Sequence, residues 1–430
     1  MPQSSPDGDV HPTEDASVPA ATPLTAPREG VPPLATSAAD VAEVARRLAG
    51  GTGPVAVDTE RASGYRYSGR AYLVQLRRAG AGSALIDPTE AGPLDALAQV
   101  LNPLEWVLHS ADQDLPCLAE IGLHPAALFD TELAGRVLNQ GKVNLAAMVE
   151  REFGLLLAKQ HGAADWSRRP LPADWLNYAA LDVELLVEMR DSLSRQLHAQ
   201  GKAEWARQEF EHVRTAPPPA PRPDRWRKTS GLHRVGGRRR LAAVRSLWTA
   251  RDTLAESLDR APGRVLPDSA IIEAALADPG TTHELRALAV FGGPRQRKRS
   301  ALWLDALAEA RGLPDSALPP KRPAGGIPPA GRWPAARPEA ADRLAAARGA
   351  VAAIAEANDL PAENVLEPRV LRELCWGDGT GSAGVGAAAD VSPESSEHID
   401  ALLHAAGARE WQCALTAEAL AAAFRGHARA

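Results

Sequence analysis

The chain has 430 residues, which is too long for one ordinary domain and predicts two to four. Hydrophobic residues make up 45% of it, enough for each of these domains to bury a substantial core. The formal net charge is −6, which excludes a molecule that is basic overall, so any surface for nucleic acid must come from local clusters of charge.

The three cysteines, Cys117, Cys375 and Cys413, have no paired spacing, so we expect neither a disulfide framework nor a zinc cluster. No apolar run approaches the length of a membrane span, and the start of the chain lacks the plan of a secretory signal. We therefore expect a soluble, cytoplasmic protein that has no membrane partner.

Residues 1–34 are rich in Pro, Ser, Thr and acidic side chains and contain few large apolar ones, which predicts a disordered tail. Helix and strand patterns then alternate up to about Phe210. The predicted strands are residues 55–60, 72–77, 84–87 and 106–109, and the predicted helices are 39–48, 94–101 and 115–121. Strands followed by alternation with helices predict an α/β domain over residues 35–213, with a mixed sheet flanked by helices.

The strand 55–60 carries two acidic side chains, Asp58 and Glu60. Strand side chains alternate between faces, so these two project together while Val55 and Val57 point to the other side. Adjacent carboxylates in a buried strand repel each other and lose hydration unless a cation offsets both. A hard divalent ion such as Mg²⁺ meets that need. An exposed strand tip or a helix cap is the alternative.

Two further acidic groups follow in the same α/β-patterned stretch. Asp114 precedes the predicted helix 115–121, where it could simply favour the positive end of a helix. Tyr178 and Asp182 are four residues apart in a helical pattern and share one face, which is also common among surface residues. Their joint order and spacing with Asp58 and Glu60 favour a shared site.

These groups resemble the three exonuclease motifs of the DEDD superfamily, in its tyrosine-bearing branch, and more closely those of the ribonuclease D family. The matching segments are Asp58-Thr59-Glu60 with the strand 72–76, His109 to Leu115, and Asp165 to Leu171 followed by Tyr178 to Val183. The resemblance covers residues from about 38 to 210, and all five functional positions are occupied. It implies a ribonuclease-H-like α/β exonuclease domain.

The resemblance also implies two divalent metal ions, Mg²⁺ or Mn²⁺, and a role for each residue. Asp58, Glu60 and Asp182 would hold the first ion. Asp58 would also reach the second, which Asp114 would orient through water. Tyr178 would position or deprotonate the attacking water. Lys159 and Arg169, near the third motif, are candidates for contact with nucleic-acid phosphates, although an ion pair with a nearby carboxylate would equally explain Arg169.

A Pro-rich and basic linker is predicted over residues 214–233. Arg227 and Lys228 flank Trp226 in an arginine cluster that suits phosphate contact and base stacking, although a solvated linker explains the charges equally well. Residues 234–315 resemble the HRDC domain (helicase and ribonuclease D C-terminal), a small helical bundle.

A second helical module is predicted near the end of the chain. The segment from Leu254 to Pro267 is repeated about 100 residues later, from Ile354 to Glu367, which predicts a second HRDC-like bundle over residues 339–428. A linker over residues 316–338 separates the two bundles. The expected architecture is therefore one α/β domain followed by two all-α bundles.

The resemblance implies a 3′–5′ exoribonuclease that releases nucleoside 5′-monophosphates, with RNA, and tRNA precursors in particular, as its partner. We expect a monomer. A 3′–5′ DNA exonuclease is the alternative, since proofreading domains carry the same five residues and no motif here identifies contacts to a 2′-hydroxyl. A binding protein with an inactive nuclease fold is a third reading, which the intact carboxylates disfavour.

Overall fold

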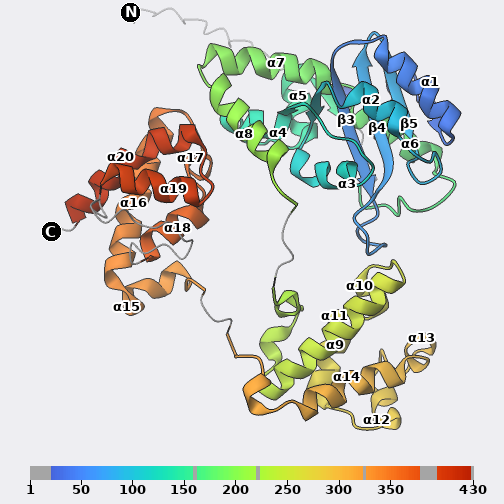
Figure 1. Ribbon diagram of the computed structural model, residues 1–430, viewed down its shortest axis with the longest axis vertical. Coiled ribbons are helices and arrows are strands. Elements are labelled where there is room, and N and C mark those ends of the chain that lie inside the picture. Colours follow the sequence, from blue (N-terminus) through green and yellow to red (C-terminus); the bar gives the residue numbers. More distant parts are fainter. Residues whose placement is uncertain (1–20, 158–161, 219–222, 323–325, 378–394, 428–430) are drawn as a thin grey trace, which may run out of the picture.

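The computed structural model describes residues 21–157, 162–218, 223–322, 326–377 and 395–427. They form three bodies, which we call the α/β domain (residues 21–218), the first helical domain (223–322) and the second helical domain (326–427) (Figure 1). Every helix in these ranges is too short or too polar to cross a lipid bilayer.

A six-stranded mixed sheet forms the centre of the α/β domain, as predicted. Its spatial order is β2 (Leu34–Ala35), β5 (Gly82–Ile86), β4 (Ala71–Ala79), β3 (Thr52–Arg61), β6 (Glu105–Leu108) and β7 (Ala127–Asp130). Strands β3, β4 and β5 pair antiparallel, whereas β6 and β7 continue from β3 in parallel. The strand β3 therefore lies inside the sheet, and its apolar run Val55-Ala56-Val57 is fully buried.

Helices cover this sheet on both faces (Figure 1). They are α1 (Ala38–Ala49), α2 (Asp95–Leu101), α3 (Leu115–Ala119), α4 (Thr131–Val137), α5 (Leu145–Phe153), α6 (Ala173–Asp182), α7 (Leu186–Ala199) and α8 (Ala203–Thr215). The start of helix α1 is determined by the local sequence, because Ser37 and Asp40 form a reciprocal capping box there. Its buried side chains, Val41 and Leu48 among them, belong to the same core as the sheet.

The predicted disordered tail, residues 1–34, is wrong for residues 21–34. Strand β1 (Thr22–Leu24) pairs in parallel with β8 (Leu155–Leu157). Beyond β1, Arg28 donates to the fully buried carboxylate of Glu184 at 2.7 Å and to Glu188 at 2.5 Å. A partner strand and a buried carboxylate thus order a segment that has little apolar surface of its own. Residues 1–20 lie outside the described ranges.

The first helical domain packs around a separate hydrophobic core. Its helices are α9 (Arg238–Ser257), α10 (Pro262–Val265), α11 (Asp268–Ala277), α12 (Thr282–Ala287), α13 (Pro294–Arg297) and α14 (Ser300–Gly312). Two short 3₁₀ turns, η2 (Arg225–Lys228) and η3 (Leu232–Arg234), precede α9. Trp226 is 3% exposed and lies in this core, so neither of the two alternatives for this segment, a base-stacking platform or a solvated linker, describes it. The predicted linker 214–233 accordingly ends earlier, because the residues from η2 onward pack with the bundle.

The second helical domain repeats the plan of the first. Its helices are α15 (Trp333–Ala336), α16 (Pro338–Ala357), α17 (Ala362–Val365), α18 (Pro368–Trp376), α19 (Ser396–Ala405) and α20 (Glu410–His427). In both domains a 20-residue helix is followed by a left-handed aspartate and then by a four-residue helix. The aspartates are Asp259 (φ 43°) and Asp359 (φ 49°). Trp333 is fully buried in this domain, so the predicted linker 316–338 also ends earlier.

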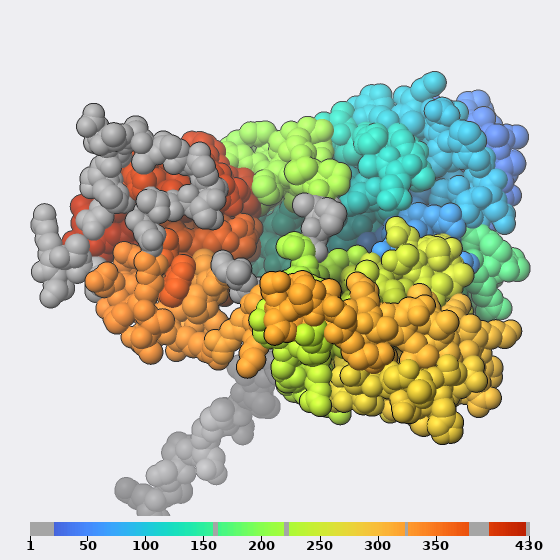
Figure 2. All heavy atoms as spheres, turned by 60° about the horizontal axis from the view of Figure 1, so that its bottom comes forward, coloured from blue at the N-terminus to red at the C-terminus, as the bar shows by residue number. Residues whose placement is uncertain are grey.

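Both helical domains contact the α/β domain through these equivalent aspartates. The carboxylate of Asp259 accepts the backbone N–H groups of Tyr67 and Ser68, in the loop between β3 and β4, at 3.2 and 2.9 Å. The carbonyl oxygen of Asp359 accepts from Lys202 Nζ at 2.9 Å, and its carboxylate accepts from Asn139 at 2.7 Å. Figure 2 shows the two helical domains side by side against the α/β domain.

We predict that Arg28→Ala lowers the free energy of unfolding by about 1–3 kcal/mol, because the buried Glu184 loses charged hydrogen-bond donors. Chemical denaturation of the full chain measures the change. The control is Arg46→Ala, which removes an exposed pair with Glu43 and should cost less than about 0.5 kcal/mol. Equal effects of the two substitutions would show that the N-terminal segment does not contribute to stability.

Candidate active site

Strand β3 places Asp58 and Glu60 on one face of the sheet, as predicted from their spacing. Asp58 pairs with Gln75 and Glu60 with Leu73 of β4, so both positions are fixed by the backbone ladder. Glu60 is 7% exposed. Backbone pairing of β3 therefore holds these two acidic side chains at the edge of the buried core.

Asp114 approaches the same strand from the turn between β6 and α3. It occupies the position before α3 but makes no capping hydrogen bond there. Its carboxylate instead accepts from Thr59 Oγ1 at 3.1 Å and lies 3.8 Å from Arg61 Nη2. The alternative that Asp114 merely favours a helix end is therefore wrong.

A buried aspartate holds the turn that carries Asp114. Asp130, at the end of β7, accepts the N–H of Ala111 at 2.7 Å and the N–H of Glu132 at 2.9 Å. It thereby fixes this turn and caps α4 at once. Ser110 begins the turn in a left-handed conformation with φ 63°, which serine adopts rarely and which these bonds stabilise.

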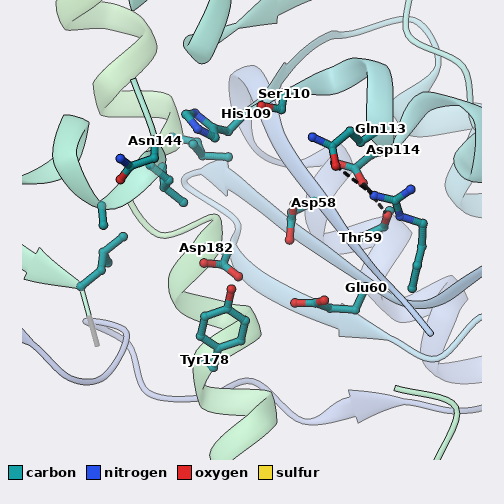
Figure 3. Close-up of a pocket in the computed structure, with 15 residues that line it drawn as sticks. Asp58, Thr59, Glu60, His109, Ser110, Gln113, Asp114, Asn144, Tyr178 and Asp182 are labelled. Carbon is teal, nitrogen blue, oxygen red and sulfur yellow. Dashed lines mark hydrogen bonds and ion pairs between the residues drawn. The ribbon is translucent and has the colours of Figure 1, made fainter. Parts of the chain in front are cut away.

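Helix α6 presents Tyr178 and Asp182 toward β3 (Figure 3). Ala179 and Ala180, between them, are fully buried and fix the rotation of the helix. The ring of Tyr178 lies 6.5 Å from that of Trp166, which is itself fully buried. The tyrosine hydroxyl and the Asp182 carboxylate are hydrogen-bonded to each other.

These side chains meet in a pocket of about 280 Å³. All five predicted catalytic residues line it: Asp58, Glu60, Asp114, Tyr178 and Asp182 (Figure 3). Asp58, Glu60 and Asp182 each offer a carboxylate oxygen, and the three oxygens lie within 4.8 Å of one another. Residues from β3, from the turn before α3 and from α6, up to 124 positions apart in the chain, thus converge as the motifs predicted.

Burial and mutual repulsion disturb the ionisation of every carboxylate in this pocket. Burial raises the pKa of Asp58 well above its usual range, and the charges of Asp114, Asp182 and Glu60 raise it further. Burial, followed by the charges of Asp182 and Asp114, raises the pKa of Glu60 to about 9. Burial also raises the pKa values of Asp114 and Asp182 to about 7, although Arg61 and Tyr178 respectively oppose the rise.

The donor set fits divalent metal ions. Four carboxylates share the pocket, whereas Arg61 is the one arginine or lysine among its lining residues. Hard cations such as Mg²⁺ and Mn²⁺ prefer carboxylate and water oxygens, and a charge of +2 or more would offset the repulsion that raises these pKa values. Among the described residues that line it, the pocket therefore offers more carboxylate charge than positive charge.

The outcome differs among the four residues that were predicted to contact nucleic acid. Lys159 lies outside the described residues. Arg169 pairs with the buried Asp87 at 2.5 Å and donates to the carbonyl oxygen of Tyr72 at 2.9 Å, which agrees with the alternative of an ion pair with a carboxylate. Arg227 is likewise engaged, with Asp224 at 2.9 Å and over the ring of Trp226. Lys228 is exposed, and its predicted contact stays a prediction.

Several residues of the pocket were not expected from the sequence. Thr59 and Arg61 contact Asp114, and Asn144 lines the pocket while capping α5. Asp130, which does not line the pocket, holds the turn before α3. Arg61 follows a shift in the β3–β4 register, between Glu60 and Arg61, that no local pattern signals. The sequence signal that could have identified Arg61 is its position next to Glu60.

Comparison with family models divides the chain as the structure does. A "3'-5' exonuclease" model matches residues 34–198, an "HRDC domain" model matches residues 240–307, and a "3' to 5' exonuclease C-terminal domain" model matches residues 326–424. The exonuclease match covers the sheet and all five predicted catalytic residues.

The chain is also similar to whole proteins over most of its length. Ribonuclease D of Acidiphilium cryptum is 32% identical over 324 residues, covering 71% of this chain and 80% of the relative. A crystal structure of a protein from Bifidobacterium adolescentis is 37% identical with a TM-score of 0.84, covering 94% of this chain and all of that chain. Escherichia coli RNase D, described as an exoribonuclease involved in structured RNA processing, is 25% identical with a TM-score of 0.62, covering 80% and 90%.

We predict that Asp182→Asn stabilises the metal-free protein at pH 8 by at least about 1.4 kcal/mol, the equivalent of one pKa unit. The folded pKa of Asp182, about 7, lies above its usual 3.8, so ionisation costs the folded state more than the unfolded state. This cost is absent below about pH 4, grows as the pH rises toward 7 and is constant above.

Urea denaturation in excess chelator at pH 5 and pH 8 measures this gain, which should be larger at pH 8. Glu150→Gln neutralises an exposed carboxyl of the same domain and serves as the control, with little expected change. A loss of stability in Asp182→Asn at pH 8 would contradict the repulsion described here.

Proposed function

The chain belongs to the ribonuclease D family, and we propose that its acidic pocket is the active site at which it removes nucleoside 5′-monophosphates from the 3′ ends of RNA. As a member of this family it is a 3′–5′ exoribonuclease, a phosphodiester hydrolase. The convergence of all five motif residues on one pocket carries the assignment of the site.

The carboxylates divide between two metal positions in this proposal. Asp58, Glu60 and Asp182, whose oxygens lie within 4.8 Å of one another, hold one divalent ion. Asp58 would also reach the second ion, which Asp114, hydrogen-bonded to Thr59, would orient through water. When bound, two Mg²⁺ or Mn²⁺ ions supply a lowered pKa for the attacking water and positive charge beside the attacking and leaving oxygens.

Tyr178 orients the attacking water in this proposal and does not deprotonate it. Burial, followed by the charges of Asp182 and Glu60, raises the pKa of its phenol far above the usual value of 10. In the metal-free pocket the phenol is therefore protonated and donates to Asp182. In this proposal it orients water as a neutral hydrogen-bonding group.

RNA is the proposed substrate because the named relatives are ribonucleases, and one is described as acting on structured RNA. We infer that tRNA precursors are among its targets and that a monomer in the cytoplasm acts on them. The division of the chain into an exonuclease domain and two HRDC-like bundles supports a division of tasks, in which the bundles hold the body of the RNA while its 3′ end reaches the pocket. A 3′–5′ DNA exonuclease stays the alternative, since no contact to a 2′-hydroxyl is identified.

Asp58→Asn is expected to abolish cleavage, because the substitution removes the ligand shared by both metal positions. The assay uses a 5′-labelled tRNA precursor with a 3′ extension and a DNA of the same sequence, with Mg²⁺ and with excess chelator. Wild-type protein should shorten the RNA from its 3′ end, and chelator should stop it. Faster shortening of the DNA would favour the alternative, and turnover by Asp58→Asn would refute the site.

Tyr178→Phe should slow single-turnover cleavage by about 10-fold or more, because the water loses its oriented partner. Its rate should keep the pH dependence of the wild type, since the phenol does not titrate in the working range. The control is Tyr72→Phe, whose hydroxyl accepts from Arg70 and lies outside the pocket lining. A changed pH profile in Tyr178→Phe would mean that the phenol is itself the base.

A further inference from the structure

A second cluster of metal-ligating side chains lies in the second helical domain, on elements separate from those that form the acidic pocket. Asp400 and His404 are four residues apart on α19 and so share one face of that helix. Cys413, on α20, faces them. Each of the three side chains offers one ligand atom, and these atoms lie within 4.8 Å of one another.

The distances suit a tetrahedral metal ion. His404 Nδ1 lies 3.3 Å from Asp400 Oδ2 and, in the absence of metal, donates to the backbone carbonyl oxygen of Asp400 at 3.1 Å. Two ligands with bonds of about 2.0–2.1 Å in a tetrahedral zinc site are about 3.4 Å apart, so this pair already has the required separation. Cys413 is fully buried and fixed in place. Asp400 and His404 are partly exposed, so rotation of their side chains can close the remaining distance to the sulfur.

A carboxylate stands behind the histidine. His404 Nε2 lies 2.9 Å from Glu410 Oε2, at the start of α20. A histidine that binds a metal through one ring nitrogen commonly donates its other N–H to a carboxylate, which fixes the ring and strengthens the ligand. Glu410 has that position when a metal at Nδ1 displaces the proton that this nitrogen otherwise donates to the carbonyl oxygen of Asp400.

We propose that Asp400, His404 and Cys413 bind a zinc ion, with water in the fourth position and Glu410 supporting His404. A thiolate, an imidazole and a carboxylate together favour Zn²⁺ over Mg²⁺, Mn²⁺ or Ca²⁺, which prefer oxygen ligands alone. The acidic pocket offers carboxylate oxygens. The two sites therefore select different metals by donor chemistry.

The position of this site gives the zinc a structural task. It joins α19 to α20 near Arg409, in the connection between them, and Trp411, in the first turn of α20. Arg409 Nε donates to Glu209 of α8 at 2.7 Å, and the ring of Trp411 stacks on that of Trp205 at 5.1 Å. Zinc would thus brace the corner by which the second helical domain contacts the α/β domain.

Cobalt substitution tests the proposal. The reduced, metal-free full chain is titrated with Co²⁺, and absorption is followed in the near-ultraviolet, where charge transfer from a thiolate to Co²⁺ appears. We expect this band to saturate at one equivalent and to disappear when Zn²⁺ is added. Carboxylate oxygens give no such band, so the result does not depend on the proposed nuclease site.

Variants assign the band to these residues. Cys413→Ser should remove it, and His404→Gln should weaken Co²⁺ binding at least about 10-fold, as the loss of a ligand or of its support does. His398→Gln, on the same helix but outside the cluster, is the matched control and should bind as the wild type does. His404 is exposed, so its variant remains informative if Cys413→Ser does not fold.

The proposal is overturned by any of three results. The wild-type chain shows no thiolate band, the band persists in folded Cys413→Ser, or His404→Gln binds Co²⁺ as tightly as His398→Gln does.

Discussion

Like charges that share a buried pocket repel one another, and in this protein the rest of the fold must outweigh that repulsion. The carboxylates of Asp58, Glu60, Asp114 and Asp182 are brought together from three separate parts of the α/β domain. Each comes from an element with little freedom. Strand β3 is paired on both sides, the turn before α3 is held by Asp130, and α6 is fixed by its buried alanines. The metal-free pocket is therefore a strained arrangement that divalent ions relieve.

The same constraint explains why the third motif is followed by buried ion pairs that hold it in place. Asp182 ends α6, and Glu184, two residues on, is fully buried. Its carboxylate is met by Arg28 from the N-terminal segment and by Arg77 of β4 at 3.4 Å. One acidic residue after the motif thus faces arginines inside the protein, whereas those of the motif face the pocket. That contrast separates a carboxylate that stabilises the fold from the carboxylates that would hold metal in the proposed site.

Much of the site could be predicted because its ligands follow local rules. Alternation along β3 placed Asp58 beside Glu60, and helical spacing placed Tyr178 beside Asp182. What failed depended on partners remote in the sequence. The residues before β2 have a composition typical of disorder, and nothing near Arg28 reveals a carboxylate 156 positions away. Trp226 among arginines suits a base platform until the packing of the first helical domain buries it. The spacing of cysteines, likewise, does not reveal that Asp400 and His404 of α19 lie beside Cys413 of α20.

The matched aspartates of the two helical domains have a consequence for how such a chain can arise. Asp259 and Asp359 occupy the same left-handed turn in two modules, and each grips the α/β domain with oxygen atoms at that turn. The hydrogen-bond acceptors are a property of the helical module, because their donors on the α/β domain differ. The donors are backbone amides in one case and a lysine and an asparagine in the other. A duplicated module would therefore already contain the acceptors that attach it to a neighbouring domain. The protein could gain a repeat without first evolving a new interface.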